Sequence, residues 1–169
     1  MNKARKMFEE ELKAFEACTD EEMTALFKRE KNDSEALNRF LEGNLHRAFA
    51  IASEFESEPV DFMDLIQEGS LAILEFFQNE SDWTEVSAAN LDQAVRTAVE
   101  AFIEEERQNL DTAKELASKL NMLDFLTTKI AEKTGREATK EELAKAMDLP
   151  EDEIDYLLRV ALSAVNKED

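Results

Sequence analysis

The sequence predicts an all-α fold for this chain of 169 residues. Apolar residues recur at helical spacing almost throughout, and no stretch shows the alternation that is typical of a β-strand. With only three Gly and two Pro, the chain offers few points at which a helix would be broken. Its length suits one large domain or two small ones. We therefore expect long helices in two units, at residues 1–108 and 111–169.

The first unit is expected to hold five helices. Thr19 and Glu22 have the spacing of a capping box, and Asp33 or Ser34 can cap the helix that follows. Glu58-Pro59 ends that helix, because Pro disfavours helical geometry in the residue before it. The helix that Asp61 caps is apolar around most of its circumference, Leu71 included, and is therefore expected to be central. The expected spans are 3–17, 19–31, 34–58, 61–77 and 86–108.

The second unit is expected to hold three helices. The first covers residues 113–133 and ends at Gly135, a natural C-terminal cap. Thr139 and Glu142 form a second capping box. Pro150 lies in the first turn of the last helix, where its missing N–H costs nothing. Three short helices joined in this way resemble a small helix-turn-helix bundle.

Charge is distributed unevenly along the chain. Asp and Glu number 40 against 20 Lys and Arg, which gives a net charge of -20. Between Ala48 and Val95 there are eleven acidic residues and no Lys or Arg. Such a segment repels the phosphates of nucleic acids and suits a basic protein surface.

Several motifs occur in a fixed order. An acidic segment at 19–36 comes first, and Asn44-Leu45-His46 follows it. The hexapeptide Asp64-Leu65-Ile66-Gln67-Glu68-Gly69 is next, inside an apolar helical run, and Gly135-Arg136-Glu137-Ala138-Thr139 comes last. In order and spacing these motifs resemble the sigma-70 family of bacterial RNA polymerase sigma factors. The resemblance implies a sigma-70-like helical domain at 1–108, followed by the small bundle that forms the next domain of the family.

The resemblance also implies a partner, the coiled coil of the largest subunit of core RNA polymerase. Asp64, Gln67 and Glu68 are three and four residues apart, so one helix face can carry all three. The carboxylates of Asp64 and Glu68 can form charge-assisted hydrogen bonds with Arg. A solvated helix face with no partner is the other interpretation of the same pattern. The positions that match the family's polymerase contacts are Asn44, Leu45, Met63, Asp64, Gln67, Glu68, Ser70 and Leu74.

The DNA-reading segment departs from the family pattern. The family's Trp-Trp-Ile-Arg-Gln-Ala corresponds here to residues 89–94, where both Trp are absent and Asp92 replaces the Arg. Exposed aromatic rings stack on unpaired bases with about 1–3 kcal/mol per base. Trp83 is not expected to replace that platform, and Arg96 is the only basic residue between Ala48 and Glu106. We expect weak or absent promoter binding by the unaided protein, and no counterpart of the family's C-terminal promoter-binding domain.

Catalytic and metal chemistry are not expected. The chain has one His and one Cys, and it lacks a glycine-rich phosphate loop and a calcium loop. We therefore predict no enzyme activity, no cofactor and no metal. The lone Cys18 allows no internal disulfide and fits the reducing cytoplasm. No apolar stretch approaches the roughly 20 residues that cross a bilayer, so no membrane association is expected.

Three hypotheses on function remain. The first is a sigma-70-like transcription initiation protein that binds core RNA polymerase but has weakened or lost promoter recognition. The second is an acidic regulator that mimics DNA, occupies a basic protein surface or competes with true sigma factors. The third is an ordinary sigma factor that starts transcription without help.

Overall fold

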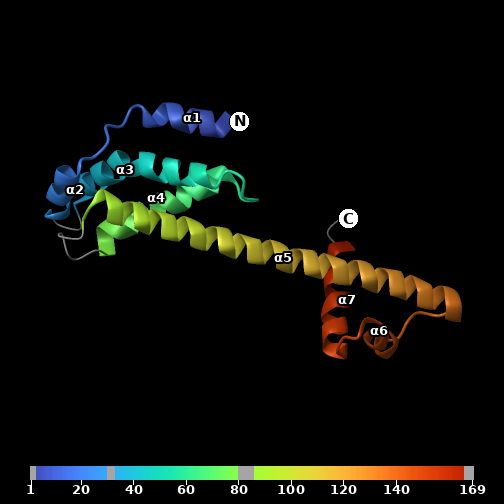
Figure 1. Cartoon of the computed structure of the whole chain (residues 1–169). Coiled ribbons are helices and arrows are strands. Elements are labelled where there is room, and N and C mark those ends of the chain that lie inside the picture. Colours follow the sequence, from blue (N-terminus) through green and yellow to red (C-terminus); the bar gives the residue numbers. More distant parts are fainter. Residues whose placement is uncertain (1–2, 30–32, 80–85, 166–169) are drawn as a thin grey trace. The chain divides into compact units, whose positions relative to one another are not determined.

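The computed structural model describes residues 3–29, 33–79 and 86–165, and their regular structure consists of helices alone (Figure 1). The prediction of an all-α fold is thereby confirmed. The chain forms two compact units, Met1–Arg107 and Gln108–Asp169. The helices are α1 (Lys3–Leu12), α2 (Asp20–Phe27), α3 (Ser34–Glu54), α4 (Phe62–Asn79), α5 (Ala88–Thr134), α6 (Lys140–Met147) and α7 (Glu151–Val165).

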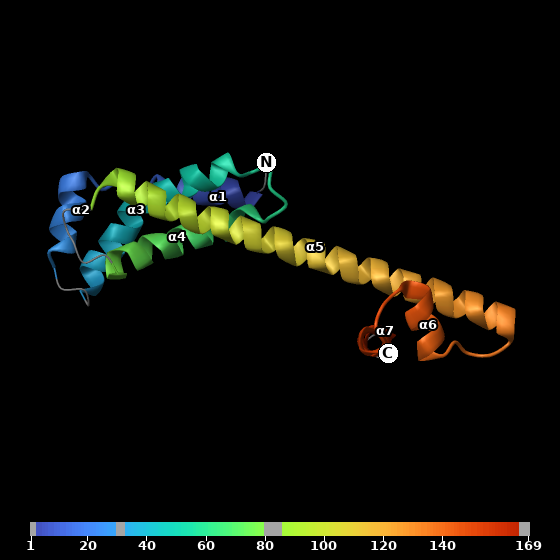
Figure 2. The same cartoon turned by 60° about the horizontal axis from the view of Figure 1, so that its bottom comes forward.

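The core of the first unit lies between α3, α4 and the beginning of α5, which run beside one another in Figure 2. Three aromatic rings from α2, α3 and α4 meet there: the Phe27 and Phe77 centroids are 5.0 Å apart, and those of Phe40 and Phe77 are 5.1 Å apart. Val95 and Val99 of α5 are fully buried in the same core. The apolar spacing of these helices therefore places one continuous stripe of each in the core.

Side-chain caps begin α2 and α3 as the sequence predicts. The Asp33 carboxylate accepts hydrogen bonds from the amides of Glu35 and Ala36, both at 3.1 Å. Thr19 accepts from the Glu22 amide at 3.2 Å. The Glu22 carboxylate, however, accepts two hydrogen bonds of 2.8 Å from the Arg39 guanidinium. The Glu22 side chain, which was expected to complete the capping box, thus forms a bidentate ion pair with Arg39 of α3 instead.

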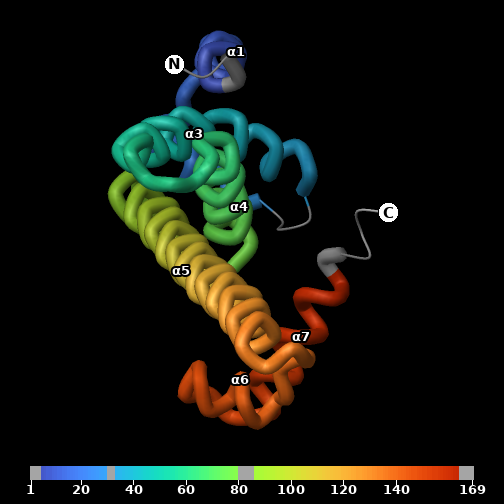
Figure 3. The backbone as a smooth tube through the Cα atoms, turned by 90° about the vertical axis from the view of Figure 1, so that its right-hand side faces the viewer, coloured from blue at the N-terminus to red at the C-terminus, as the bar shows by residue number. Residues whose placement is uncertain are grey.

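Several predicted helix boundaries are wrong. Helix α1 ends at Leu12 instead of Ala17, and hydrogen bonds between residues three apart continue from it to Phe15. Helix α3 ends at Glu54, before the predicted stop at Glu58-Pro59. The two helices expected at 86–108 and 113–133 are one continuous helix, α5, of 47 residues (Figure 3). Asn109-Leu110-Asp111 contains no Gly or Pro, so nothing in its backbone chemistry stops a helix.

The second unit packs the C-terminal part of α5 against α6 and α7. Its core is small, with Leu123, Leu143, Ile154 and Leu157 buried. Gly135 ends α5 with a φ of 67°, in the left-handed region that favours glycine.

Candidate docking surface

One face of α4 is open to solvent and carries the side chains that the sequence singled out. Asp64 and Gln67 are exposed, and Glu68 is half-buried beside them. Their side chains make no hydrogen bond or ion pair with the described part of the chain. The inward side of the same helix buries Leu65 and Ile73 completely. Core packing therefore fixes the orientation of α4 and leaves this polar trio available to a partner.

Leu71 lies on the same open face, although the sequence did not predict it as a surface residue. Its side chain is 46% exposed, although the sequence placed it among the apolar core positions of this helix. It follows Asp64, Gln67 and Glu68 at intervals of seven, four and three residues, which is the spacing of one helix face. Leu71 therefore adds an apolar side chain at the C-terminal end of this polar face. We define the docking face as Asp64, Gln67, Glu68 and Leu71.

Asn44 lies inside the protein, so its side chain cannot contribute to an exposed surface. Its Nδ2 donates to the Phe40 carbonyl at 2.7 Å, and its Oδ1 accepts from Arg47 Nε at 2.9 Å. Arg47 Nη1 in turn donates to the Asp92 carboxylate at 2.8 Å. Asn44 therefore helps to position Arg47, whose ion pair with Asp92 joins α3 to α5. Its neighbour Leu45 is half-buried.

The three remaining predicted residues are only partly accessible. Met63 is half-buried and packs against the core of the first unit. Ser70 is half-buried, and its hydroxyl donates to the Ile66 carbonyl at 2.7 Å. Leu74 is half-buried too. These side chains flank the docking face, but they project from it less than Leu71 does.

The arginines around the first part of α5 are paired with acids. Arg96 Nη2 lies 2.8 Å from the Glu54 carboxylate, and Arg107 Nη2 lies 2.6 Å from that of Glu58. The hydrogen bond from Arg96 holds the pKa of Glu54 below its usual range. Arg47 is committed to Asp92 in the same way. Each of these guanidinium groups is therefore engaged by a carboxylate of the same chain, which offsets its positive charge.

The aromatic platform of the family pattern is not present on α5. Ala89 and Asn90 occupy the positions that correspond to the two Trp, and both are exposed. Trp83 lies outside the described residues. Gln93 is exposed on the next turn, where its amide donates to Thr97 at 3.2 Å.

Residues for metal or thiol chemistry do not converge in the described ranges. No group of three or more His, Cys, Asp or Glu side chains is placed there to hold a metal ion. The Cys18 thiol is buried, and burial raises its pKa to about 11, which keeps it protonated near neutral pH. Among the described helices, none combines the length and hydropathy needed to cross a bilayer.

Comparisons with known proteins give two findings. Residues 118–166 match the family model "Sigma-70 region 3". The chain is 26% identical over 180 residues to the RNA polymerase sigma factor SigA of Listeria monocytogenes, an alignment that covers 99% of this chain and 46% of the relative. It is 27% identical over 167 residues to SigA of Clostridium acetobutylicum, with coverage of 96% and 44%. The chain thus spans less than half the length of these curated relatives.

Proposed function

We propose that this chain, which is similar to SigA sigma factors along nearly its whole length, is a sigma-70-like protein that binds core RNA polymerase through the docking face of α4. The observation that carries the proposal is the common face of the exposed Asp64 and Gln67 and the half-buried Glu68, which have no partners in the described part of the chain. The partner surface is the basic coiled coil of the largest polymerase subunit. Such a protein acts in the cytoplasm.

The docking face has the composition of a small protein interface. Carboxylates that meet Arg in a partly desolvated contact form charge-assisted hydrogen bonds of roughly 1.5–3 kcal/mol. The exposed Leu71 adds apolar area at the C-terminal end of the face, and burying that area against a partner favours binding. The polar residues and Leu71 together suit a basic partner that also offers an apolar contact.

We further propose that promoter recognition by the unaided protein is weak or absent. Phosphate contacts dominate affinity for DNA, and the arginines around the first part of α5 are paired with Glu54, Glu58 and Asp92. Ala89 and Asn90 supply no ring on which an unpaired base could stack. The protein would then act with a DNA-binding partner or by competing with other sigma factors.

Retention of the purified protein on immobilised core RNA polymerase tests the proposal. We expect Glu68→Lys and Leu71→Asp each to lower retention at least tenfold, and Gln67→Ala to lower it less. Asp124→Lys makes a charge change like that of Glu68→Lys at an exposed position of α5, and it should leave retention unchanged. Equal retention of Glu68→Lys and wild type would refute docking through this face.

The acidic-regulator hypothesis is the second candidate, and the net charge of -20 favours it. It predicts that the chain displaces a housekeeping sigma factor from core polymerase without supporting transcription. Several acidic residues of the first unit, however, form ion pairs and therefore do not contribute to a free acidic surface. Their partners are Arg5, Arg39, Arg96 and Arg107. Promoter-specific transcription with core enzyme and this protein alone would instead support an ordinary sigma factor.

A further inference from the structure

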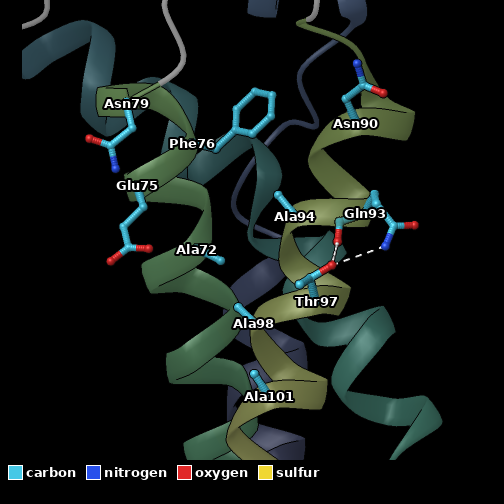
Figure 4. A pocket seen from close by; sticks show the side chains of 10 residues that line it. All are labelled: Ala72, Glu75, Phe76, Asn79, Asn90, Gln93, Ala94, Thr97, Ala98 and Ala101. Carbon is cyan, nitrogen blue, oxygen red and sulfur yellow. Dashed lines mark hydrogen bonds between the residues drawn. The ribbon is translucent and has the colours of Figure 1, made fainter.

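Helices α4 and α5 leave an open groove between them within the first unit. Its volume is about 770 Å³, and Figure 4 shows the side chains that line it. Small apolar side chains lie along the middle, from Ala72 on α4 and from Ala94, Ala98 and Ala101 on α5. Phe76 lies between the helices nearer the end where α5 begins. Small side chains let the backbone of a third helix approach closely, as the interaxial distances of 8–10 Å in helix packing require.

The first turns of α5 present different residues to α3 and to α4. Arg96 and Asp92 lie on the side towards α3, where a separate hollow is lined by both of them together with Arg47 and Glu54. Among the described residues, the lining of the groove towards α4 contains no basic side chain, and Glu75 is its only charged one. This part of α5 therefore places Arg96 away from the groove and offers small and polar residues to it.

Acidic side chains continue the groove in both directions. Glu68 precedes Ala72 by one helical turn on α4, and Glu105 follows Ala101 by one turn on α5, so both lie on the same side of their helices as the groove. Glu105 is exposed and makes no hydrogen bond or ion pair with the described part of the chain. In Figure 4, Glu75 points outward from α4 and Gln93 outward from α5. The rim is polar and negative, and the middle is apolar.

We propose that this groove binds a cationic amphipathic helix of a partner protein. The apolar stripe of the helix packs against the four alanines and Phe76, and its Lys or Arg side chains pair with Glu75 and Glu105. A helix that binds in a groove inserts its own apolar side chains at positions i, i+3, i+4 and i+7. The space between α4 and α5 can accept such a stripe. A nucleic-acid strand is disfavoured because its phosphates would face this acidic rim without a basic residue in the lining. Glu68 borders both the groove and the docking face, but the described residues that line the groove include none of the docking face.

A fluorescently labelled model peptide of Lys, Ala and Leu tests this inference by anisotropy. The peptide carries its apolar residues at helical spacing, and a scrambled peptide of the same composition provides the charge control. We expect wild type to bind the patterned peptide at least tenfold more tightly than the scrambled one. Ala101→Arg, at an exposed position in the groove, should weaken that binding at least tenfold. Ala25→Arg, on an exposed position of α2, should change it less than twofold.

Further variants separate the groove from the docking face and from a folding defect. Glu75→Lys should also weaken peptide binding, while Gln67→Ala should leave it intact. Gln93→Lys gives a second groove variant if circular dichroism shows that Ala101→Arg has lost helix. Equal affinity for the two peptides, or unchanged binding by the folded groove variants, overturns the proposal. Binding of single-stranded or duplex DNA that groove variants abolish would also overturn it, because it would identify a nucleic-acid site.

Discussion

At the scale of single residues, Asp92 has a structural role that its place in the family motif does not suggest. It accepts a 2.8 Å hydrogen bond from Arg47, whose side chain is only 14% exposed. Asn44 completes the arrangement by accepting from Arg47 Nε. The acid that replaces the family's Arg therefore neutralises a largely buried cation between α3 and α5.

Replacing Asp92 with Arg, as the family pattern has it, should destabilise the fold. Arg47 would lose its carboxylate and face a like charge, and breaking such a partly buried pair is expected to cost about 1–2 kcal/mol. Urea unfolding followed by circular dichroism measures this cost. Ala89→Arg adds the same side chain at an exposed position one turn earlier and should stay within about 0.5 kcal/mol of wild type. Equal stability of the two variants would show that the pair contributes nothing.

Gly69 of the hexapeptide is a packing residue. A Cβ built there would lie 2.9 Å from the Ala48 Cβ and 3.3 Å from Val95 Cγ1, so the glycine allows α3 and α4 to approach closely. Overpacking by one methyl costs about 1–3 kcal/mol, and the better helix propensity of Ala returns about 1 kcal/mol. Gly69→Ala should therefore destabilise the protein by about 1 kcal/mol in urea unfolding. In an Ala48→Gly background the same change should become stabilising, and a cost that persists there would contradict this explanation.

The site was partly predictable at this scale. The spacing of Asp64, Gln67 and Glu68 gave their common face, because helical period alone decides which side chains are neighbours. Asn44 could not be assigned in the same way, since its hydrogen bonds to Phe40 and Arg47 depend on how α3 packs. Leu71 was misplaced because apolarity predicts burial only on average, and an exposed Leu has no local sequence signature.

At the scale of elements, helix beginnings were more predictable than helix ends. Thr139 forms the complete capping box, with its amide donating to Glu142 at 2.9 Å and its hydroxyl accepting from the Glu142 amide at 3.2 Å. Such caps are local and depend on a few adjacent residues. The prediction of separate helices at 86–108 and 113–133 is wrong, because the residues between them carry no helix-breaking Gly or Pro and are compatible with an exposed helix.

The capping box of α6 should make that helix sensitive to acid. Hydrogen bonds from Arg136 and from the Thr139 amide lower the pKa of Glu142 from 4.5 to about 2. A depressed carboxyl pKa in the folded state adds stability above pH 4.5, and this contribution is lost as the pH falls from 4.5 towards 2. Hydrogen exchange of the α6 amides should therefore accelerate in that window. In Glu142→Gln the acceleration should be smaller, and an NMR titration midpoint of Glu142 near 4.5 would contradict the prediction.

At the scale of the whole molecule, excess negative charge determines the response to salt. Acids outnumber bases by 40 to 20, and most ion pairs of the described residues involve exposed side chains. Exposed pairs contribute about 0–1 kcal/mol each and weaken in salt. The repulsion among the unpaired acids is screened by the same salt, with a Debye length of about 10 Å at 0.1 M. The net effect therefore depends on which of the two sets of charges dominates.

We expect repulsion to dominate, so that added NaCl stabilises the fold. Eleven acids without a single Lys or Arg lie between Ala48 and Val95, and pairing with arginines outside that segment leaves several of them uncompensated. Relief of self-repulsion by about 1–2 kcal/mol should raise Tm by roughly 3–8 °C between 0.01 M and 0.5 M NaCl. Choline chloride should give the same increase, because screening does not depend on the cation. A fall in Tm with salt would mean that the ion pairs of Arg47, Arg96 and Arg107 outweigh the excess charge.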